Sequence, residues 1–165
     1  MRRIGITGGI GSGKSVVSRL LRIMGYSVYD TDSEAKRLME SSLEVVQKLS
    51  ECFGRDIYHN GRLNRGLLSS RVFGKSDKIV LLNSIVHPVV RFDFYRWSES
   101  LNEEICFVES AILYESRFDE LVDEVWTVTA PEELRIGRVR QRSGLTEEEI
   151  KKRMAAQLSE EEKQR

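Results

Sequence analysis

An eight-residue stretch near the N-terminus has the residue types and spacing of a phosphate-binding loop. It fits the pattern G-x-x-x-x-G-K-[ST] and reads Gly8-Gly9-Ile10-Gly11-Ser12-Gly13-Lys14-Ser15. Backbone N–H groups in such a loop converge on a polyphosphate, and the following helix adds the partial positive charge of its N-terminus. The pattern predicts a nucleotide site that consists of Gly9, Ile10, Gly11, Ser12, Gly13, Lys14, Ser15 and Val16.

Two side chains at the end of this loop have separate expected roles. Lys14 is expected to reach the β- and γ-phosphates, and the Ser15 hydroxyl is expected to ligate Mg²⁺. The alternative is a glycine-rich turn with an incidental lysine. The context favours the loop, because an apolar segment at residues 4–7 precedes it and an amphipathic run follows it. That run has helical spacing and consists of Val16, Val17, Leu20, Leu21 and Met24.

Two carboxylates, Asp30 and Asp32, follow the next apolar segment, residues 26–29. Ligands of a doubly wound sheet bind beyond the carboxyl ends of its strands, and residues i and i+2 of an extended chain point the same way. A carboxylate there can accept the proton of an acceptor hydroxyl during phosphoryl transfer and help to organise Mg²⁺. The alternative is that Asp32 caps a helix that starts near Ser33. The residues alone support both interpretations equally.

Arg138 and Arg142 are four residues apart and therefore neighbours on one helix face. Guanidinium groups bind phosphate oxygens bidentately and stabilise charge in the transition state, which predicts a lid over residues 131–158. The alternative is an ordinary charged surface helix.

Two single residues have weaker signals. Glu109 follows the apolar run 105–108, where many phosphate-loop proteins place an acid that holds Mg²⁺ through water. His87 stands beside Pro88, and a lone histidine is more often structural or exposed than a metal ligand.

The elements that must position these residues alternate between strands and helices, which predicts an α/β fold with a parallel sheet. Strands are expected at residues 4–7, 26–29, 105–108 and 124–128. Helices are expected at residues 33–39, 43–53, 65–73 and 78–97, within an insertion over residues 33–100. Two more helices are expected, one after a Thr129 cap and one after a capping box at Thr146. The whole chain, 1–165, is expected to be one domain.

Composition narrows the class of protein. Among the 165 residues, Lys+Arg and Asp+Glu balance at 26 each, so no basic field points to nucleic acid. No run approaches the roughly 18 apolar residues of a membrane helix, and no signal peptide follows Met1, which predicts a cytoplasmic location without a membrane partner. Cys52 and Cys106 are expected to be reduced thiols, with Cys106 buried.

A phosphate-binding loop is common to kinases, GTPases and motor ATPases. A GTPase would usually add Asp-x-x-Gly after an apolar strand and a base-reading Asn-Lys-x-Asp, and neither is present. The size and the helical insertion favour a small-molecule kinase. The alternatives are a kinase for a nucleoside, nucleotide or shikimate-like acceptor, and a nucleotide-binding module without transfer activity.

Several motifs together resemble the dephospho-coenzyme A kinase family over nearly the whole chain. They are the loop with Thr7, Asp30-Thr31-Asp32, Gly61-Arg62-Leu63-Asn64-Arg65, Leu68, Val72-Phe73, Ile85-Val86-His87-Pro88, Leu113-Tyr114-Glu115, Arg138, Gln141-Arg142, Arg153 and Gln157.

The resemblance implies a P-loop kinase-type fold and MgATP-dependent phosphorylation of the ribose 3′-hydroxyl of dephospho-CoA. It implies that Asp32 is the general base and that Arg138 and Arg142 are lid arginines acting with Lys14. Arg65 and His87 would line the acceptor site with Asp32. The protein is expected to be a monomer or a small homo-oligomer.

The chain departs from the family pattern at three places. Asn64 stands where the family typically has Asp, and Glu109-Ser110-Ala111 replaces a segment that usually contains proline. The family pattern also continues past position 165 into another strand and a final helix, which we expect this chain to lack. The residues that recognise adenine are therefore left unassigned.

Overall fold

The structure is a computed structural model that describes residues 1–163 of the 165-residue chain. The chain divides into two compact units. One comprises Met1–Asp30 and Ser98–Arg165, and the other is Thr31–Trp97. The second unit corresponds closely to the insertion predicted over residues 33–100. Residues 164 and 165 of the predicted domain lie outside the described residues.

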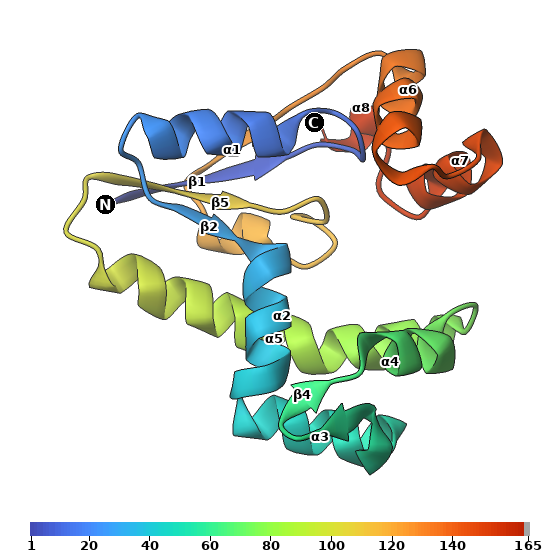
Figure 1. The fold of residues 1–165 in the computed structure, drawn as a ribbon. Helices are drawn as coiled ribbons and strands as arrows, with labels where there is room; N and C mark the ends of the chain where they lie inside the picture. Colours follow the sequence, from blue (N-terminus) through green and yellow to red (C-terminus); the bar gives the residue numbers. More distant parts are fainter. Residues whose placement is uncertain (164–165) are drawn as a thin grey trace. The chain divides into compact units, whose positions relative to one another are not determined.

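The first unit is built on a four-stranded parallel sheet (Figure 1). Its strands, in sheet order, are β2 (Val28–Asp30), β5 (Ile105–Glu109), β1 (Arg2–Thr7) and β6 (Glu124–Thr127). All four predicted strands are present, with ends shifted by at most two residues, and the predicted α/β class is confirmed. The apolar runs are nearly continuous because strands of such a sheet are covered on both faces.

One face of the sheet is covered by α1 (Lys14–Ile23), the helix that follows the loop (Figure 1). Leu21 is buried in a cluster with Ile4, Ile6 and Phe107. Only part of the predicted apolar run faces this cluster, since Val16 is 64% exposed. Successive helical residues are about 100° apart, so one member of each adjacent apolar pair points away from the sheet.

The cysteines are free, as expected. Cys106 is fully buried on β5, and burial raises the pKa of its thiol. Cys52 is exposed. Cys106 therefore packs as a small apolar side chain.

The second unit is mostly helical, as predicted. Its helices are α2 (Thr31–Ser41), α3 (Leu43–Phe53), α4 (Arg65–Val72) and α5 (Ser76–Ser100), the last of which continues into the first unit. Among the described residues no helix combines the length and the apolar character needed to cross a membrane.

A small hairpin in the second unit was not predicted. After a short 3₁₀ turn, η1 (Arg55–Ile57), β3 (Tyr58–His59) pairs with β4 (Arg62–Leu63). The turn between them is Asn60-Gly61, and both residues have positive φ, 49° and 77°. Asn-Gly is the preferred turn of a two-residue hairpin, but strands of two residues are too short to show a period of two.

The predicted lid region contains α6 (Glu132–Ser143), whose start differs from the prediction. Pro131, with ψ 140°, occupies the N-cap position, and no side chain among the described residues caps the helix. The predicted Thr129 cap is therefore wrong, because the extended chain continues two residues past it.

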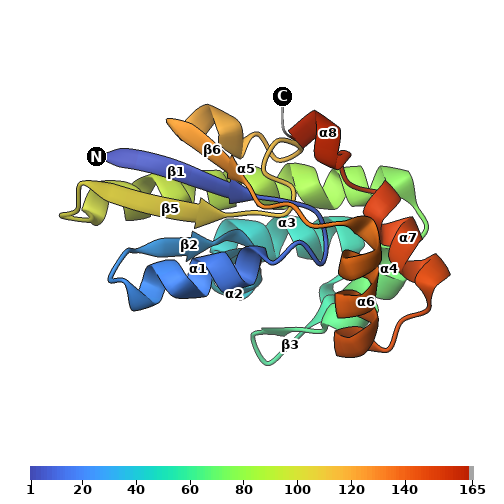
Figure 2. The ribbon, with the colours of Figure 1, turned by 90° about the horizontal axis from the view of Figure 1, so that it is seen from above.

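A second helix of this region, α7 (Glu147–Ala155), begins with the predicted capping box. Thr146 Oγ1 accepts from the Glu149 backbone N–H, and the Glu149 carboxylate accepts from the Thr146 N–H. Figure 2 shows α6 and α7 beyond the carboxyl ends of the strands, where ligands of open α/β sheets bind. A 3₁₀ turn, η2 (Phe118–Leu121), and a short α8 (Glu160–Lys163) complete the described elements.

Candidate active site

The phosphate-binding loop turns the chain from the end of β1 into α1 at Gly13. Gly13 occupies the N-cap position with φ 107°, a left-handed conformation that favours glycine. No side chain of the described residues caps this helix, and its first turn carries no acidic residue. The helix start therefore directs the positive end of its dipole at the loop, and the first turn of the helix supplies no carboxylate of its own to neutralise it.

Lys14 folds back over the loop. Its ammonium donates to the carbonyl oxygens of Gly8 at 2.7 Å and Gly9 at 3.3 Å. The side chain is buried, so most of its length is fixed against protein. The geometry holds a cation directly at the loop, and its predicted contact with phosphate oxygens remains a prediction.

Side chains whose oxygen atoms could ligate a metal ion lie at the start of α1 and at the ends of β2 and β5. The Ser15 hydroxyl donates to the Glu109 carboxylate at 3.4 Å, and Glu109 is the last residue of β5. Asp30, the last residue of β2, pairs in register with Glu109. Carboxylate and hydroxyl oxygens are the ligands that Mg²⁺ prefers, so the chemistry of these residues fits a magnesium ion.

The two predicted lid arginines differ in their surroundings. Arg138 Nη1 donates to the carbonyl oxygens of Gly11 and Ser12, both at 3.3 Å. Arg142 lies one turn further along α6 and is exposed. The structure therefore brings Arg138 to the phosphate-binding loop, and Arg142 follows one turn further along the same face of α6.

Two further residues contact the loop, and sequence reasoning missed their roles. Arg135 is 6% exposed, and its Nε donates to the Ile10 carbonyl at 3.0 Å. The Gln157 side-chain carbonyl accepts from the Ile10 N–H at 3.2 Å. A signal for Arg135 existed in its spacing of three from Arg138, which places both on one helix face. Gln157 entered only as one of the residues that carry the family resemblance.

Glycine at position 11 allows α6 to lie directly on the loop. A Cβ atom there would stand 2.6 Å from the Arg135 carbonyl oxygen and 3.0 Å from a Val139 methyl group. The φ of Gly11 is also positive, 79°. Any side chain at this position would separate the helix from the loop or strain the backbone.

Asp32 lies in the second unit, near the start of α2. This helix begins at Thr31, so the described bounds place Asp32 inside the first turn. The alternative in which Asp32 caps a helix starting near Ser33 does not match these bounds, although a carboxylate in the first turn still complements the helix dipole. Whether Asp32 also acts as a base remains a prediction.

The other two predicted acceptor-site residues lie on separate helices of the second unit. Arg65 is the first residue of α4, and its guanidinium is 3.6 Å from the Glu40 carboxylate. The Asn64 side chain caps α4 by accepting from the Leu67 N–H at 3.0 Å, so this departure from the family pattern retains a good capping residue. His87 is half-buried in α5, and burial lowers the pKa of its imidazole.

Comparison with known proteins identifies the family. The family model for dephospho-CoA kinase (CoaE) matches residues 2–165. The dephospho-CoA kinase of Porphyromonas gingivalis is 46% identical over 157 residues, which cover 95% of this chain and 78% of that protein. A crystal structure from Thermus thermophilus has a TM-score of 0.84 at 39% identity and covers 99% of this chain and 83% of that chain. The dephospho-CoA kinase from Campylobacter jejuni has a TM-score of 0.70 at 25% identity, covering 99% and 84%. The chain belongs to the dephospho-CoA kinase family.

Proposed function

We propose that the protein transfers the γ-phosphoryl group of ATP to the ribose 3′-hydroxyl of dephospho-CoA to give coenzyme A. The observation that carries this proposal is the Lys14 ammonium folded onto the phosphate-binding loop in a chain of this kinase family. A loop of this kind binds a polyphosphate, and the family specifies the acceptor.

The phosphate groups are bound by two segments of the first unit, the phosphate-binding loop and α6. Lys14 and the loop N–H groups hold the β- and γ-phosphates. Arg138, already on the loop, and Arg142, one turn away, bind the oxygens of the transferred group and stabilise the charge that develops on them. Arg142 reaches this group only if the lid region closes.

A magnesium ion would be held by Ser15 and, through water, by Glu109, and it would neutralise charge between the β- and γ-phosphates. The acceptor oxygen forms the new bond to phosphorus as the bond from phosphorus to the β–γ bridging oxygen breaks. The hydroxyl proton passes to the Asp32 carboxylate. ADP leaves with the negative charge of the broken bond.

The acceptor is bound by the second unit in this proposal. Arg65 supplies a cation for acceptor phosphates, and His87, whose imidazole burial keeps neutral at pH 7, supplies a hydrogen-bonding side chain. A cytoplasmic location and a monomeric or small homo-oligomeric state complete the proposal.

The test is an assay in which ATP is offered with dephospho-CoA, a nucleoside monophosphate or shikimate in turn. Formation of coenzyme A and ADP in equal amounts, lost in Lys14→Met, supports the proposal. Turnover of either other acceptor but not of dephospho-CoA would refute it in favour of another small-molecule kinase. ATP binding without product from any acceptor would refute it in favour of a nucleotide-binding module.

A further inference from the structure

The peptide groups on both sides of Ile10 are held by side chains from outside the loop. The Ile10 N–H donates to the Gln157 side chain at 3.2 Å, and the Ile10 carbonyl accepts from Arg135 Nε at 3.0 Å. We call Arg135 and Gln157 the Ile10 clamp. Its two bonds fix two successive peptide planes, because the N–H and the carbonyl of one residue belong to different planes.

These planes lie in the part of the chain that has the least conformational preference of its own. Ile10 is flanked by Gly9 and Gly11, and Gly8 precedes them. Glycine loses more conformational freedom than any other residue when its backbone is fixed. A loop of this composition therefore needs external contacts to keep its N–H groups aimed at one point.

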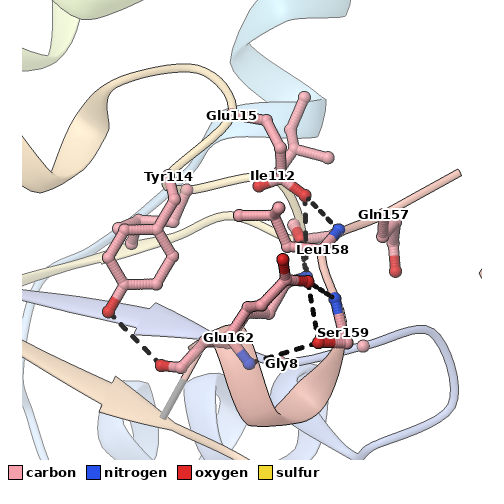
Figure 3. Close-up of polar contacts among 12 residues, drawn as sticks. Gly8, Ile112, Tyr114, Glu115, Gln157, Leu158, Ser159 and Glu162 are labelled. Carbon is pink, nitrogen blue, oxygen red and sulfur yellow. Dashed lines mark hydrogen bonds and ion pairs between the residues drawn. The ribbon is translucent and has the colours of Figure 1, made fainter. Parts of the chain in front are cut away.

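The Gln157 arm of the clamp comes from a segment that is itself anchored. The neighbouring Leu158 N–H donates to the Glu115 carboxylate at 2.9 Å (Figure 3). Lys163 is fully buried, donates to the Ala111 carbonyl at 2.9 Å and lies 3.9 Å from the same Glu115 carboxylate. These contacts attach the chain after α7 to the segment that follows β5, so Gln157 approaches the loop from a fixed position.

The Arg135 arm comes from the beginning of the lid region. Arg135 is buried on the face of α6 that touches Gly11, and Val139 on the same face is also buried. The two arms thus come from opposite ends of residues 131–158, the segment predicted to close over the phosphates. The part of this segment between them carries Arg138 and Arg142.

We propose that Arg135 and Gln157 are positioning residues that hold the phosphate-binding loop in its nucleotide-binding conformation and tie it to both ends of the lid region. They act through the Ile10 backbone and do not themselves touch the nucleotide. The proposal deepens the proposed function and rests on it only for ATP as the nucleotide. Neither residue belongs to the loop motif, and Arg135 is not among the residues that carry the family resemblance.

The expected effect is on nucleotide affinity. A net hydrogen bond is worth on the order of 1 kcal/mol, about fivefold in an equilibrium constant, and a bond from a charged donor is worth more. Gln157→Met replaces the side-chain carbonyl that accepts the hydrogen bond from Ile10 with an apolar side chain of similar size. This variant should bind ATP about fivefold more weakly. Arg135→Met should bind ATP about tenfold more weakly. Because both arms hold one residue, the double variant should lose less than the product of the single losses.

The experiment measures ATP binding by calorimetry without acceptor, and records the amide signal of Ile10 in ¹⁵N-isoleucine-labelled protein. Arg140→Met is the matched control, since Arg140 is exposed on α6. Support consists of the expected losses in the two clamp variants, a displaced Ile10 amide signal and a KM for ATP that rises at nearly constant kcat. The same variants should retain the thermal midpoint of Arg140→Met within a few degrees.

Two results would overturn the clamp. One is ATP affinity within twofold of the parent in Gln157→Met with an unmoved Ile10 amide. The other is an equal loss in Arg140→Met, which would make the effect a general property of α6. If Arg135→Met does not fold, the ATP affinity and the Ile10 amide signal of Gln157→Met test the proposal on their own. Failure of dephospho-CoA as substrate would leave the binding measurement intact, so the two proposals fail separately.

Discussion

The Ser15 hydroxyl donates to the Glu109 carboxylate at 3.4 Å, joining the first turn of α1 to the end of β5. Residues 94 positions apart thus form one oxygen-rich corner beside the phosphate-binding loop. A hydroxyl and a carboxylate at this corner suit a hard cation, and the loop next to them suits the phosphates that such a cation bridges.

Glu109→Gln should therefore change the requirement for magnesium. The amide keeps the size of the side chain but loses the charge, so we expect half-maximal activity at a Mg²⁺ concentration higher by about tenfold, the equivalent of about 1.4 kcal/mol. Activity measured against Mg²⁺ concentration at saturating ATP checks this. Glu104→Gln, at an exposed position just before β5, should leave the curve unchanged. An unchanged curve for Glu109→Gln would remove this residue from the magnesium site.

Lys14→Met should nearly abolish transfer. It keeps an apolar stem in the buried position but removes the cation that lies over Gly8 and Gly9. Removal of one preorganised donor to developing charge costs about 10²–10³ in rate, and we expect a loss in kcat/KM of at least this size. Steady-state kinetics measure kcat/KM of Lys14→Met against the parent protein. Lys151→Met is the control, because Lys151 is exposed on α7. A loss below tenfold would contradict a phosphate role for Lys14.

The phosphate-binding loop and the capping box of α7 were predicted correctly from the sequence, because each depends on residues that are close together in the chain. The loop is one contiguous motif between a strand and a helix, and the capping box at Thr146 spans only four residues. The predicted Thr129 cap was wrong because more than one residue near the start of a helix can occupy the N-cap position. Here the chain stays extended through Pro131, which takes that position instead of Thr129. The Ile10 clamp could not be predicted, since it depends on packing between positions more than 120 residues apart.

Asp32→Asn should separate its two interpretations. As a general base, Asp32 contributes about 10² or more to kcat, while ATP binding measured without acceptor stays within twofold of the parent. As an acid in the first turn of α2, it contributes only to stability, by about 0.3–1 kcal/mol. Asp77→Asn, at the matching place in α5, reports this second effect alone. A stability loss equal to that of Asp77→Asn with normal kcat would refute the base.

Gly11→Ala should destabilise the protein, whereas Gly137→Ala should not. The new Cβ at position 11 would be 2.6 Å from the Arg135 carbonyl oxygen, on a backbone with φ 79°. Strain of this kind costs on the order of 1–3 kcal/mol. Gly137 lies inside α6 with open space around it, so alanine there should stabilise by about 0.5–1 kcal/mol. Chemical denaturation of both variants measures the difference, and equal midpoints would show that α6 does not pack on the loop in solution.

His87 should make stability depend on pH between its lowered folded-state pKa and about 6.5. Burial lowers the pKa of its imidazole in the folded protein below the value near 6.5 that the unfolded chain retains. Within this window the unfolded chain binds more protons than the folded one, so stability rises with pH and is lost as the pH falls through the folded-state pKa.

His87→Gln should remove that dependence, because glutamine does not titrate. Thermal midpoints measured from pH 5 to pH 8 should therefore fall less steeply on the acid side in His87→Gln than in the parent protein. The other histidine supplies the control, since His59 is exposed on β3 and His59→Gln should leave the slope in place. A slope that survives in His87→Gln would mean that the imidazole titrates as it does in the unfolded chain. Burial of His87 would then not be the reason why its imidazole is neutral at the acceptor site.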